Sequence, residues 1–362
     1  MKSLIALNWA GKFCAVMLLI GAAHYVTAQS GKIIEFDAPG ATETIPSGIN
    51  SANSTAGYYT DSQYIYHGFI RDTSGNLTSF DEPDAAQGAY LGTLPLGIND
   101  AGEVAGYYTP LSNPSSYQGF IRDAAGNFTS FGVTGMLTEM VFAFNDAGQT
   151  AGCATQAEYC PGSGGESEGA IRNLSGATVT FLPANAVSVF PESINSGGAV
   201  TGTYSDSKGD IHGFVRSASG TITEFDMPDD KGPGVGTFPR SINDSNEIVG
   251  VYNDVTARSR GFIRSPQGKL SRFDVPGTDI YTLPWAVNSA GTIIGAYFGG
   301  GSANYYQAFL RDAAGHVTSF SAPRAGTQPG QGTAVAGINQ LGVIAGYYID
   351  SGNVFHAYLR LP

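Results

Sequence analysis

One pattern recurs seven times along this chain of 362 residues, and each copy is marked by an Asn at a predicted turn. The turn residues are Asn50, Asn99, Asn145, Asn195, Asn243, Asn288 and Asn339. Their spacings are 49, 46, 50, 48, 45 and 51 residues. A repeat at nearly constant spacing lets a chain of this length fold as a series of stacked units rather than around one ordinary core.

Each copy begins with a predicted hairpin. Three residues after each Asn the chain has only Gly or Asn, the residues that tolerate a left-handed backbone. Seven residues after each Asn there is always a glycine: Gly57, Gly106, Gly152, Gly202, Gly250, Gly295 and Gly346. This pattern predicts a strand, a tight turn and a second strand.

A second hairpin completes the unit. The stretch HGFIRDTSGNLTSFDEP, residues 67–83, is echoed by QGFIRDAAGNFTSF and HGFVRSASGTITEFDMP, and each stretch has a turn between two alternating runs. Four strands in each of seven units predict an all-β, seven-bladed β-propeller with four antiparallel strands per blade. Residues 32–40 are predicted to form the fourth strand of a blade whose first three strands do not precede it. HAYLRLP at the C-terminus is predicted to form the third strand of a blade, and no fourth strand follows it. Together they complete the last blade and close the ring.

An arginine also recurs once in every unit: Arg71, Arg122, Arg172, Arg216, Arg264, Arg311 and Arg360. Chemistry that happens once needs no residue in every blade. We therefore expect this arginine to hold each blade to itself or to its neighbour.

The Asn-led hairpin followed by HGF, QAF or HAY and then FD-x-P resembles the bacterial extracellular HAF repeats. The resemblance covers essentially the whole chain after residue 28. It implies export and a repeat fold, and it implies no defined chemistry. The third unit departs most from the pattern, with Gly169–Arg172 and Phe181–Pro183.

Residues 1–28 predict a cleaved signal peptide, because Lys2 and Lys12 accompany an apolar run that ends in small residues. Residues 29–362 then form a single domain, exported to the periplasm or the medium. Cys14 leaves with the signal. Cys153 and Cys160 remain, and in an oxidising compartment they most simply pair with each other.

The formal net charge of -12 makes nucleic acid a poor partner and should attract cations. No later run is long enough for a membrane span, and we expect a monomer. The chain has no P-loop, HExxH motif, paired CxxC or dinucleotide fingerprint, so we expect no nucleotide or redox cofactor. GESEG, residues 165–169, matches G-x-S-x-G but lacks the strand-to-helix setting of a nucleophile elbow.

All length variation among the repeats falls in the second-to-third and fourth-to-first connections, which we predict to share one face of the disc. On the innermost strand, three residues before each Asn, no two repeats agree. We call these the rim residues and expect them to surround the mouth of a central funnel: Ser47, Leu96, Phe142, Glu192, Arg240, Trp285 and Ala336.

This variation around one axis has two interpretations, one asymmetric binding site or neutral drift at exposed positions, and both stay open. For a site, Phe142, Trp285, Tyr281 and Leu96 are the predicted ligand-binding residues. Glu192, Arg240 and His212 are the predicted catalytic residues, although His212 belongs to a recurring polar position that also includes His67 and His356.

Glu192 with Asp229 and Asp230 could hold Ca²⁺, which takes six to eight oxygen ligands; solvated acidic loops are the alternative. The first functional hypothesis is a protein that binds one small organic ligand, with a lean towards Ca²⁺-assisted hydrolysis of a lactone or ester. The second is a non-catalytic module that binds a glycan or another protein.

Overall fold

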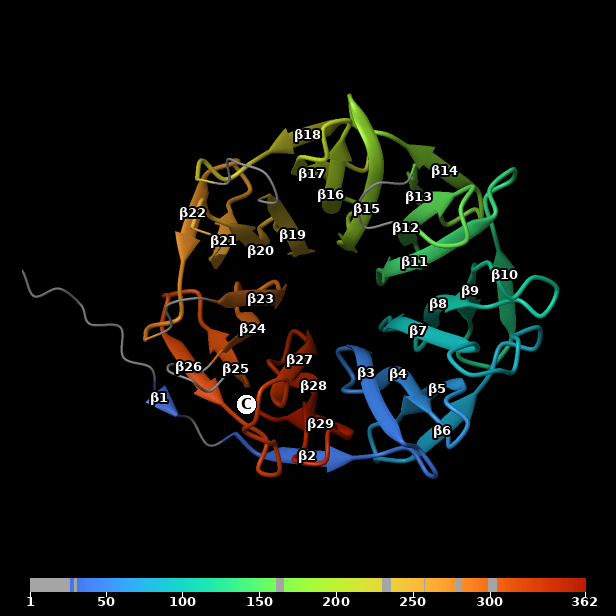
Figure 1. Ribbon diagram of the computed structural model, residues 1–362, viewed down its shortest axis with the longest axis horizontal. Helices are drawn as coiled ribbons and strands as arrows, with labels where there is room; N and C mark the ends of the chain where they lie inside the picture. The colour runs from blue at the N-terminus through green and yellow to red at the C-terminus, as the bar shows by residue number, and fades with distance from the viewer. Residues whose placement is uncertain are drawn as a thin grey trace, which may run out of the picture.

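The computed structural model describes residues 31–160, 166–229, 236–256, 258–277, 281–298 and 305–362, together with the backbone of Thr27–Ala28. In this part of the chain the regular structure is all β, and seven blades surround a central axis (Figure 1). The prediction of a seven-bladed propeller is confirmed. No helix with the length and apolar character of a membrane span occurs in the described residues.

The first three blades are each a four-stranded antiparallel sheet. Blade 1 consists of β3 (Glu43–Ile49), β4 (Thr55–Thr60), β5 (Tyr66–Arg71) and β6 (Leu77–Phe80). Blade 2 consists of β7 (Thr93–Ile98), β8 (Val104–Tyr108), β9 (Gln118–Arg122) and β10 (Phe128–Phe131). Blade 3 consists of β11 (Thr138–Phe144), β12 (Thr150–Thr155), β13 (Glu168–Arg172) and β14 (Thr178–Phe181).

The next three blades repeat this order from the axis outwards. Blade 4 consists of β15 (Ala186–Ile194), β16 (Val200–Asp206), β17 (Ile211–Arg216) and β18 (Ile222–Phe225). Blade 5 consists of β19 (Thr237–Ile242), β20 (Ile248–Asn253), β21 (Ser259–Arg264) and β22 (Leu270–Phe273). Blade 6 consists of β23 (Thr282–Val287), β24 (Ile293–Phe298), β25 (Tyr306–Arg311) and β26 (Val317–Phe320).

Blade 7 joins the two ends of the chain, as predicted. It consists of β27 (Gly332–Ile338), β28 (Ile344–Ile349), β29 (Phe355–Arg360) and β2 (Ile33–Phe36). Strand β2 runs antiparallel to β29, with Ile33 opposite Arg360 and Phe36 opposite Ala357 (Figure 1). A single bridge between Tyr306 and Gly332 connects blades 6 and 7.

The predicted signal peptide lies outside the described residues except for β1 (Thr27–Ala28), whose backbone pairs in parallel with β26. Its cleavage therefore stays a prediction. The predicted disulfide between Cys153 and Cys160 is confirmed, with the two Cα atoms 6.3 Å apart.

The recurring arginine joins neighbouring blades, which confirms its predicted role. Each guanidinium lies over a phenylalanine ring of the preceding blade's outermost strand, 4.7 to 5.1 Å from the ring centroid. Arg71, for example, covers Phe36, so the contact between blades 7 and 1 is made like the others. A cation over a desolvated aromatic face is stabilising, and here it repeats once per blade.

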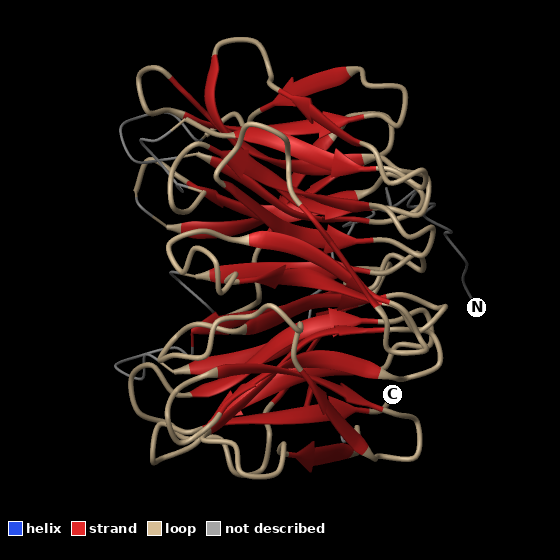
Figure 2. Ribbon diagram, turned by 90° about the vertical axis from the view of Figure 1, so that its right-hand side faces the viewer, coloured by secondary structure: helices blue, strands red, loops and turns tan. Residues whose placement is uncertain are grey.

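The strands lie between two layers of connections (Figure 2). The first residue of a third strand, where the second-to-third loop ends, forms a parallel bridge with the next fourth-to-first loop, as between Tyr66 and Gly92 or Ile211 and Gly236. The two variable connections therefore share one face, as predicted, and we call it the variable-loop face. The Asn-led turns form the opposite face, which we call the turn face.

Candidate functional site

The rim residues lie at a β-bulge in every blade. In all seven blades the register between the first and second strands shifts at the rim residue, and in blade 4 it also shifts at Val187. A bulge leaves one residue without a ladder partner and re-aims its side chain. The seven variable side chains thus all lie at a β-bulge. The sequence reasoning identified their shared position but missed the bulge.

A proline accompanies the bulge in most blades. In five blades the residue before the rim residue is proline: Pro46, Pro95, Pro191, Pro239 and Pro284. Proline has no N–H to donate, and within sheets it is tolerated at bulges. Val141 and Val335 occupy the position in the other two blades, where the bulge persists. The recurring proline was the sequence signal that could have predicted the bulge.

Three rim residues from consecutive blades contact one another around the axis. Nη1 of Arg240 donates to Oε1 of Glu192 at 2.9 Å. The guanidinium of Arg240 lies 5.6 Å from the ring centroid of Trp285, and the indole Nε1 of Trp285 donates to the carbonyl oxygen of Ala336 at 3.1 Å. Glu192, Arg240 and Trp285 were predicted as site residues from their shared rim position, and the structure brings them together as one array.

This array is partly open to solvent. The side chains of Glu192 and Arg240 are 28% and 32% exposed, and Trp285 is 48% exposed. Burial raises the pKa of the Glu192 carboxyl, and the ion pair with Arg240 opposes that rise. The net direction of the pKa shift is upward, because the cost of burying the charged carboxylate outweighs the attraction of Arg240.

Aromatic and aliphatic side chains occupy other parts of the inner wall. The rings of Phe142 and Phe190 are stacked, with centroids 5.8 Å apart, across the junction of blades 3 and 4. Leu96 is a half-buried rim residue of blade 2. Tyr281 lies apart from the axis, because it precedes β23 and its ring packs on Phe298 at 4.8 Å.

His212 does not reach the axial array. It lies on the third strand of blade 4, separated from the inner strand by β16, and its ring stacks on Tyr204. Its Nδ1 is 2.8 Å from a carboxylate oxygen of Asp226. These contacts recur in other blades, which favours the shared hydrogen-bonding role for the recurring histidines.

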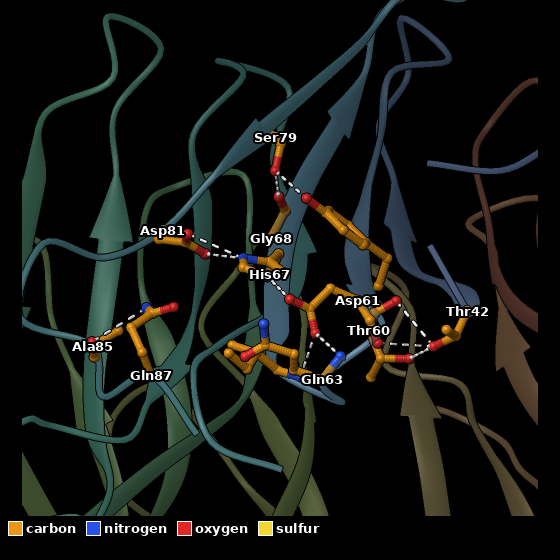
Figure 3. Close-up of polar contacts among 12 residues, drawn as sticks. Thr42, Thr60, Asp61, Gln63, His67, Gly68, Ser79, Asp81, Ala85 and Gln87 are labelled. Atoms are coloured by element: carbon orange, nitrogen blue, oxygen red, sulfur yellow. Dashed lines mark hydrogen bonds and ion pairs between the residues drawn. The ribbon is translucent and has the colours of Figure 1, made fainter. Parts of the chain in front are cut away.

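Blade 1 shows the recurring arrangement in detail (Figure 3). His67 lies between two carboxylates, with Nδ1 3.0 Å from Asp81 and Nε2 3.6 Å from Asp61. His356 repeats this between Asp37 and Asp350, and Arg260 of blade 5 lies between Asp254 and Asp274. The aspartates thus clamp one basic residue of the third strand near the variable-loop face.

The predicted metal ligands are not brought together in the described part of the chain. Asp229 is exposed and lies 3.7 Å from Arg272 on the outermost strand of blade 5, whereas Glu192 faces the axis. Asp230 lies outside the described residues. Among the described residues, no group of three or more His, Cys, Asp or Glu side chains could hold a metal ion.

A cavity of about 200 Å³ opens at the turn face, and the residues that line it flank the turn asparagines. They include the apolar residues before each Asn and, after it, Asp100, Asp146 and Asp244. The rim residues are not in this lining, because they lie three residues before the turn asparagines, towards the variable-loop face. Their place at the mouth of a funnel stays a prediction.

The turn asparagines themselves form a ring of hydrogen bonds around this cavity. In six of the seven blades, the Nδ2 of the turn Asn donates to the backbone oxygen of the next turn Asn or closes the ring from Asn339 to Asn50. These amides are therefore structural, as their recurrence in every blade predicts.

Glu139 is an unusual acid that sequence reasoning missed. It lies on β11, is 3% exposed, and its Oε2 has no hydrogen-bond partner among the described residues. Burial raises its pKa to about 7. Five other blades place at this position a threonine whose hydroxyl accepts a backbone N–H: Thr44, Thr93, Thr237, Thr282 and Thr333.

Known structures share this fold at low sequence identity. A streptogramin B lyase matches with 14% identity and a TM-score of 0.56 over 91% of this chain and 98% of that chain. The β-propeller domain of the Trilobed protease from Pyrococcus furiosus matches with 8% identity and a TM-score of 0.57, over 88% and 95% of the two chains. The BP39L lectin from Burkholderia pseudomallei matches with 13% identity and a TM-score of 0.51, over 92% and 100%.

No family model and no curated protein sequence matches the chain. At these identities the structural matches show the β-propeller fold alone, since one fold supports many unrelated functions.

Proposed function

We propose that this chain is a binding module that holds one small organic molecule at the propeller axis, against Glu192, Arg240 and Trp285. The observation that carries the proposal is the bulge in all seven inner strands. The same β-bulge directs seven different side chains towards one axis. The result is a single asymmetric site rather than seven equal sites.

The chemistry of the array favours a ring-shaped molecule that carries oxygen. Trp285 offers a half-exposed aromatic face, and Arg240 has five N–H donors, of which the ion pair with Glu192 uses one. A lactone, an ester or a sugar could place its ring on Trp285 and its oxygen against Arg240. Glu192 would then accept or donate one further hydrogen bond.

Tryptophan fluorescence tests this proposal directly. The chain has two tryptophans, and one of them, Trp9, lies in the predicted signal peptide. In a protein of residues 29–362 the emission therefore reports on Trp285. We expect a saturable change with at least one member of a panel of lactones, aryl esters and monosaccharides.

The variant Arg240→Met should weaken that binding by about tenfold or more, since it removes a charge-assisted hydrogen bond. Glu158→Gln, on an exposed loop, is the matched control and should bind like the wild type. A panel that leaves the emission unchanged, or equal binding by Arg240→Met, would overturn the proposal.

Hydrolysis of the bound lactone or ester is a second candidate, and the raised pKa of Glu192 supports it. A carboxyl whose pKa lies above its ordinary value can transfer a proton nearer neutral pH. Calcium assistance stays a prediction. Among the described residues Glu192 belongs to no group of three or more His, Cys, Asp or Glu side chains that could hold a metal ion, so calcium at Glu192 would need further ligands, for which Asp230 was predicted.

Acid release from the same panel, with calcium or with chelator, separates these ideas. Turnover that falls in Glu192→Gln supports hydrolysis at the axis, and its loss on chelation supports calcium. Ligand binding without turnover restricts the function to binding.

The membership of the HAF repeats and the export of the chain are also proposals. The Cys153–Cys160 disulfide supports an oxidising compartment. Mass spectrometry of protein recovered outside the cytoplasm should find an N-terminus at residue 29. Recovery of only the uncleaved form from the cytoplasm would contradict export.

A further inference from the structure

Two exposed tyrosines and a half-buried third form an aromatic surface on the variable-loop face between blades 1 and 2. Tyr64 and Tyr90 are 52% and 63% exposed, and their rings are stacked with centroids 5.7 Å apart. The ring of Tyr66 lies 6.3 Å from that of Tyr90. We call Tyr64, Tyr66 and Tyr90 the tyrosine platform.

Tyr64 occupies a left-handed backbone conformation that in other blades of this protein is occupied by glycine or asparagine. Its φ is 62°, in the left-handed region, and its N–H donates to the carbonyl oxygen of Asp61. The same turn in blade 4 has Gly209, bonded to Asp206, and in blade 7 it has Asn353, bonded to Asp350. Glycine and asparagine suit this conformation, and a bulky residue does not.

Tyr90 repeats the observation in the neighbouring loop. Its φ is also 62°, and it lies in a turn closed by a hydrogen bond from Leu91 to Gly88. The equivalent turn between blades 6 and 7 is closed by Gln331 and Gln328, and its left-handed residue is Gly330. Both exposed tyrosines therefore stand where sister blades place glycine or asparagine.

The fold does not require either ring. A bulky side chain at a left-handed position costs free energy, and these two rings recover little of it by burial because both are exposed. Backbone hydrogen bonds nevertheless hold the two loops together, from Tyr90 to Tyr64 at 2.8 Å and from Tyr66 to Leu91 at 2.9 Å. The two loops are thus held together before any partner arrives, with the rings of Tyr64 and Tyr90 stacked on each other, which favours a binding role.

The charge of the two loops limits the chemical class of partner that the tyrosine platform can bind. Neither loop, residues 61–66 or residues 84–92, contains Lys or Arg, and both contain an aspartate, Asp61 and Asp84. The amide side chains of Gln63 and Gln87 lie on the same loops (Figure 3). A polyanion would meet no cation here and would be repelled by the net charge of the chain.

From these observations we infer that the tyrosine platform binds an uncharged glycan. The C–H faces of pyranose rings pack against aromatic rings, while carboxylate and amide groups beside them hydrogen-bond to sugar hydroxyls. This function is separate from the axial site, because the platform lies on the loops of blades 1 and 2 and Trp285 lies on the inner strand of blade 6.

Affinity electrophoresis tests the inference with residues 29–362 in native gels that contain hydroxyethylcellulose, laminarin, glycol chitin or alginate. We expect retardation in at least one of the three uncharged polymers and none in the anionic alginate. The double variant Tyr64→Asn/Tyr90→Gly should lose at least tenfold in affinity, since tyrosines at the centre of an interface each contribute strongly.

The double variant introduces the residues that the sister blades carry, so its melting temperature should equal or exceed that of the wild type. Tyr159→Ser is the matched control, because Tyr159 is also 63% exposed and lies in another loop. Arg240→Met should be retarded like the wild type, which separates the platform from the axial site.

Absence of retardation in all three uncharged polymers would overturn the inference. So would a double variant that is retarded like the wild type, or an equal loss in Tyr159→Ser. Retardation in alginate as strong as in the uncharged polymers would also overturn it.

Discussion

The side-chain Nδ2 of Asn339 donates a hydrogen bond of 2.9 Å to the backbone oxygen of Asn50, across the junction between the last blade and the first. The same amide also contacts Oδ1 of Asn53 at 2.8 Å, and its own Oδ1 accepts the N–H groups of Leu341 and Val343. One buried side chain thus closes the ring and shapes its own turn.

Replacing Asn339 with alanine should lower the free energy of unfolding by about 2–4 kcal/mol, because several buried polar groups lose their partners. Urea unfolding measures the change. Asn76→Ala is the control, since Asn76 makes a similar side-chain contact to Asp72 in an exposed turn and should cost less than about 1 kcal/mol. Equal losses in both variants would contradict the structural role of the ring.

The inter-blade arginines should resist conservative replacement. The guanidinium of Arg264 lies 5.0 Å from the ring centroid of Phe225, which belongs to the outermost strand of blade 4. Lysine keeps the charge and loses the planar stacking surface, so Arg264→Lys should lower the free energy of unfolding by about 1–2 kcal/mol. Arg272→Lys, at a largely exposed position, should change it by less than about 0.5 kcal/mol. A loss for Arg264→Lys no larger than for Arg272→Lys would show that stacking does not hold the blades together.

Glu139 should make stability fall as the pH rises towards neutrality. Its folded-state pKa of about 7 lies above its ordinary value of 4.5, so the folded protein binds the proton more tightly than the unfolded chain. The stability is full below pH 4.5 and decreases as the pH rises to about 7. Over that window the loss amounts to about 3 kcal/mol.

The variant Glu139→Gln removes the titrating group and should be more stable than the wild type at pH 8, by at most the same about 3 kcal/mol. Urea unfolding at pH 5 and pH 8 tests this, with Glu158→Gln as an exposed control. The prediction is wrong if Glu139→Gln and the wild type lose the same stability between the two pH values.

Much of this architecture could be predicted because a repeat gives seven observations of each rule. A glycine or asparagine in every first turn, a glycine in every second strand and an arginine in every third strand predicted four strands per blade. The last blade is divided between residues 32–40 and the C-terminal stretch that ends in HAYLRLP, and this division predicted that the ring of blades closes. Roles shared by all blades, such as that of the inter-blade arginine, followed from the same logic.

The features that belong to single blades could not be predicted in this way. Glu139 occupies a position at which five other blades have threonine. Its environment depends on Ala154, which lies opposite it on β12, where the other six blades have a tyrosine. The stacking of Tyr64 on Tyr90 depends on two loops of different blades meeting in space. Glu192, Arg240 and Trp285 were predicted to surround one axis, but the bulge at which all three lie was missed, and its only sequence signal was the recurring proline.

The ion pair between Glu192 and Arg240 should appear as an energetic coupling between the two positions. Their side chains are about one-third exposed, so solvent reduces the interaction to about 1 kcal/mol. In a double-mutant cycle, Glu192→Gln with Arg240→Met should cost less than the sum of the single variants by that amount. Arg240→Met alone should cost more at pH 8 than at pH 4, because removing the cation raises the pKa of Glu192 further and leaves a partly buried carboxylate unpaired only at the higher pH. Urea unfolding of the four proteins at both pH values provides the cycle. Strict additivity at pH 8 would mean that the two side chains lie side by side without stabilising each other, and the array would then have no preorganised charge to offer a ligand.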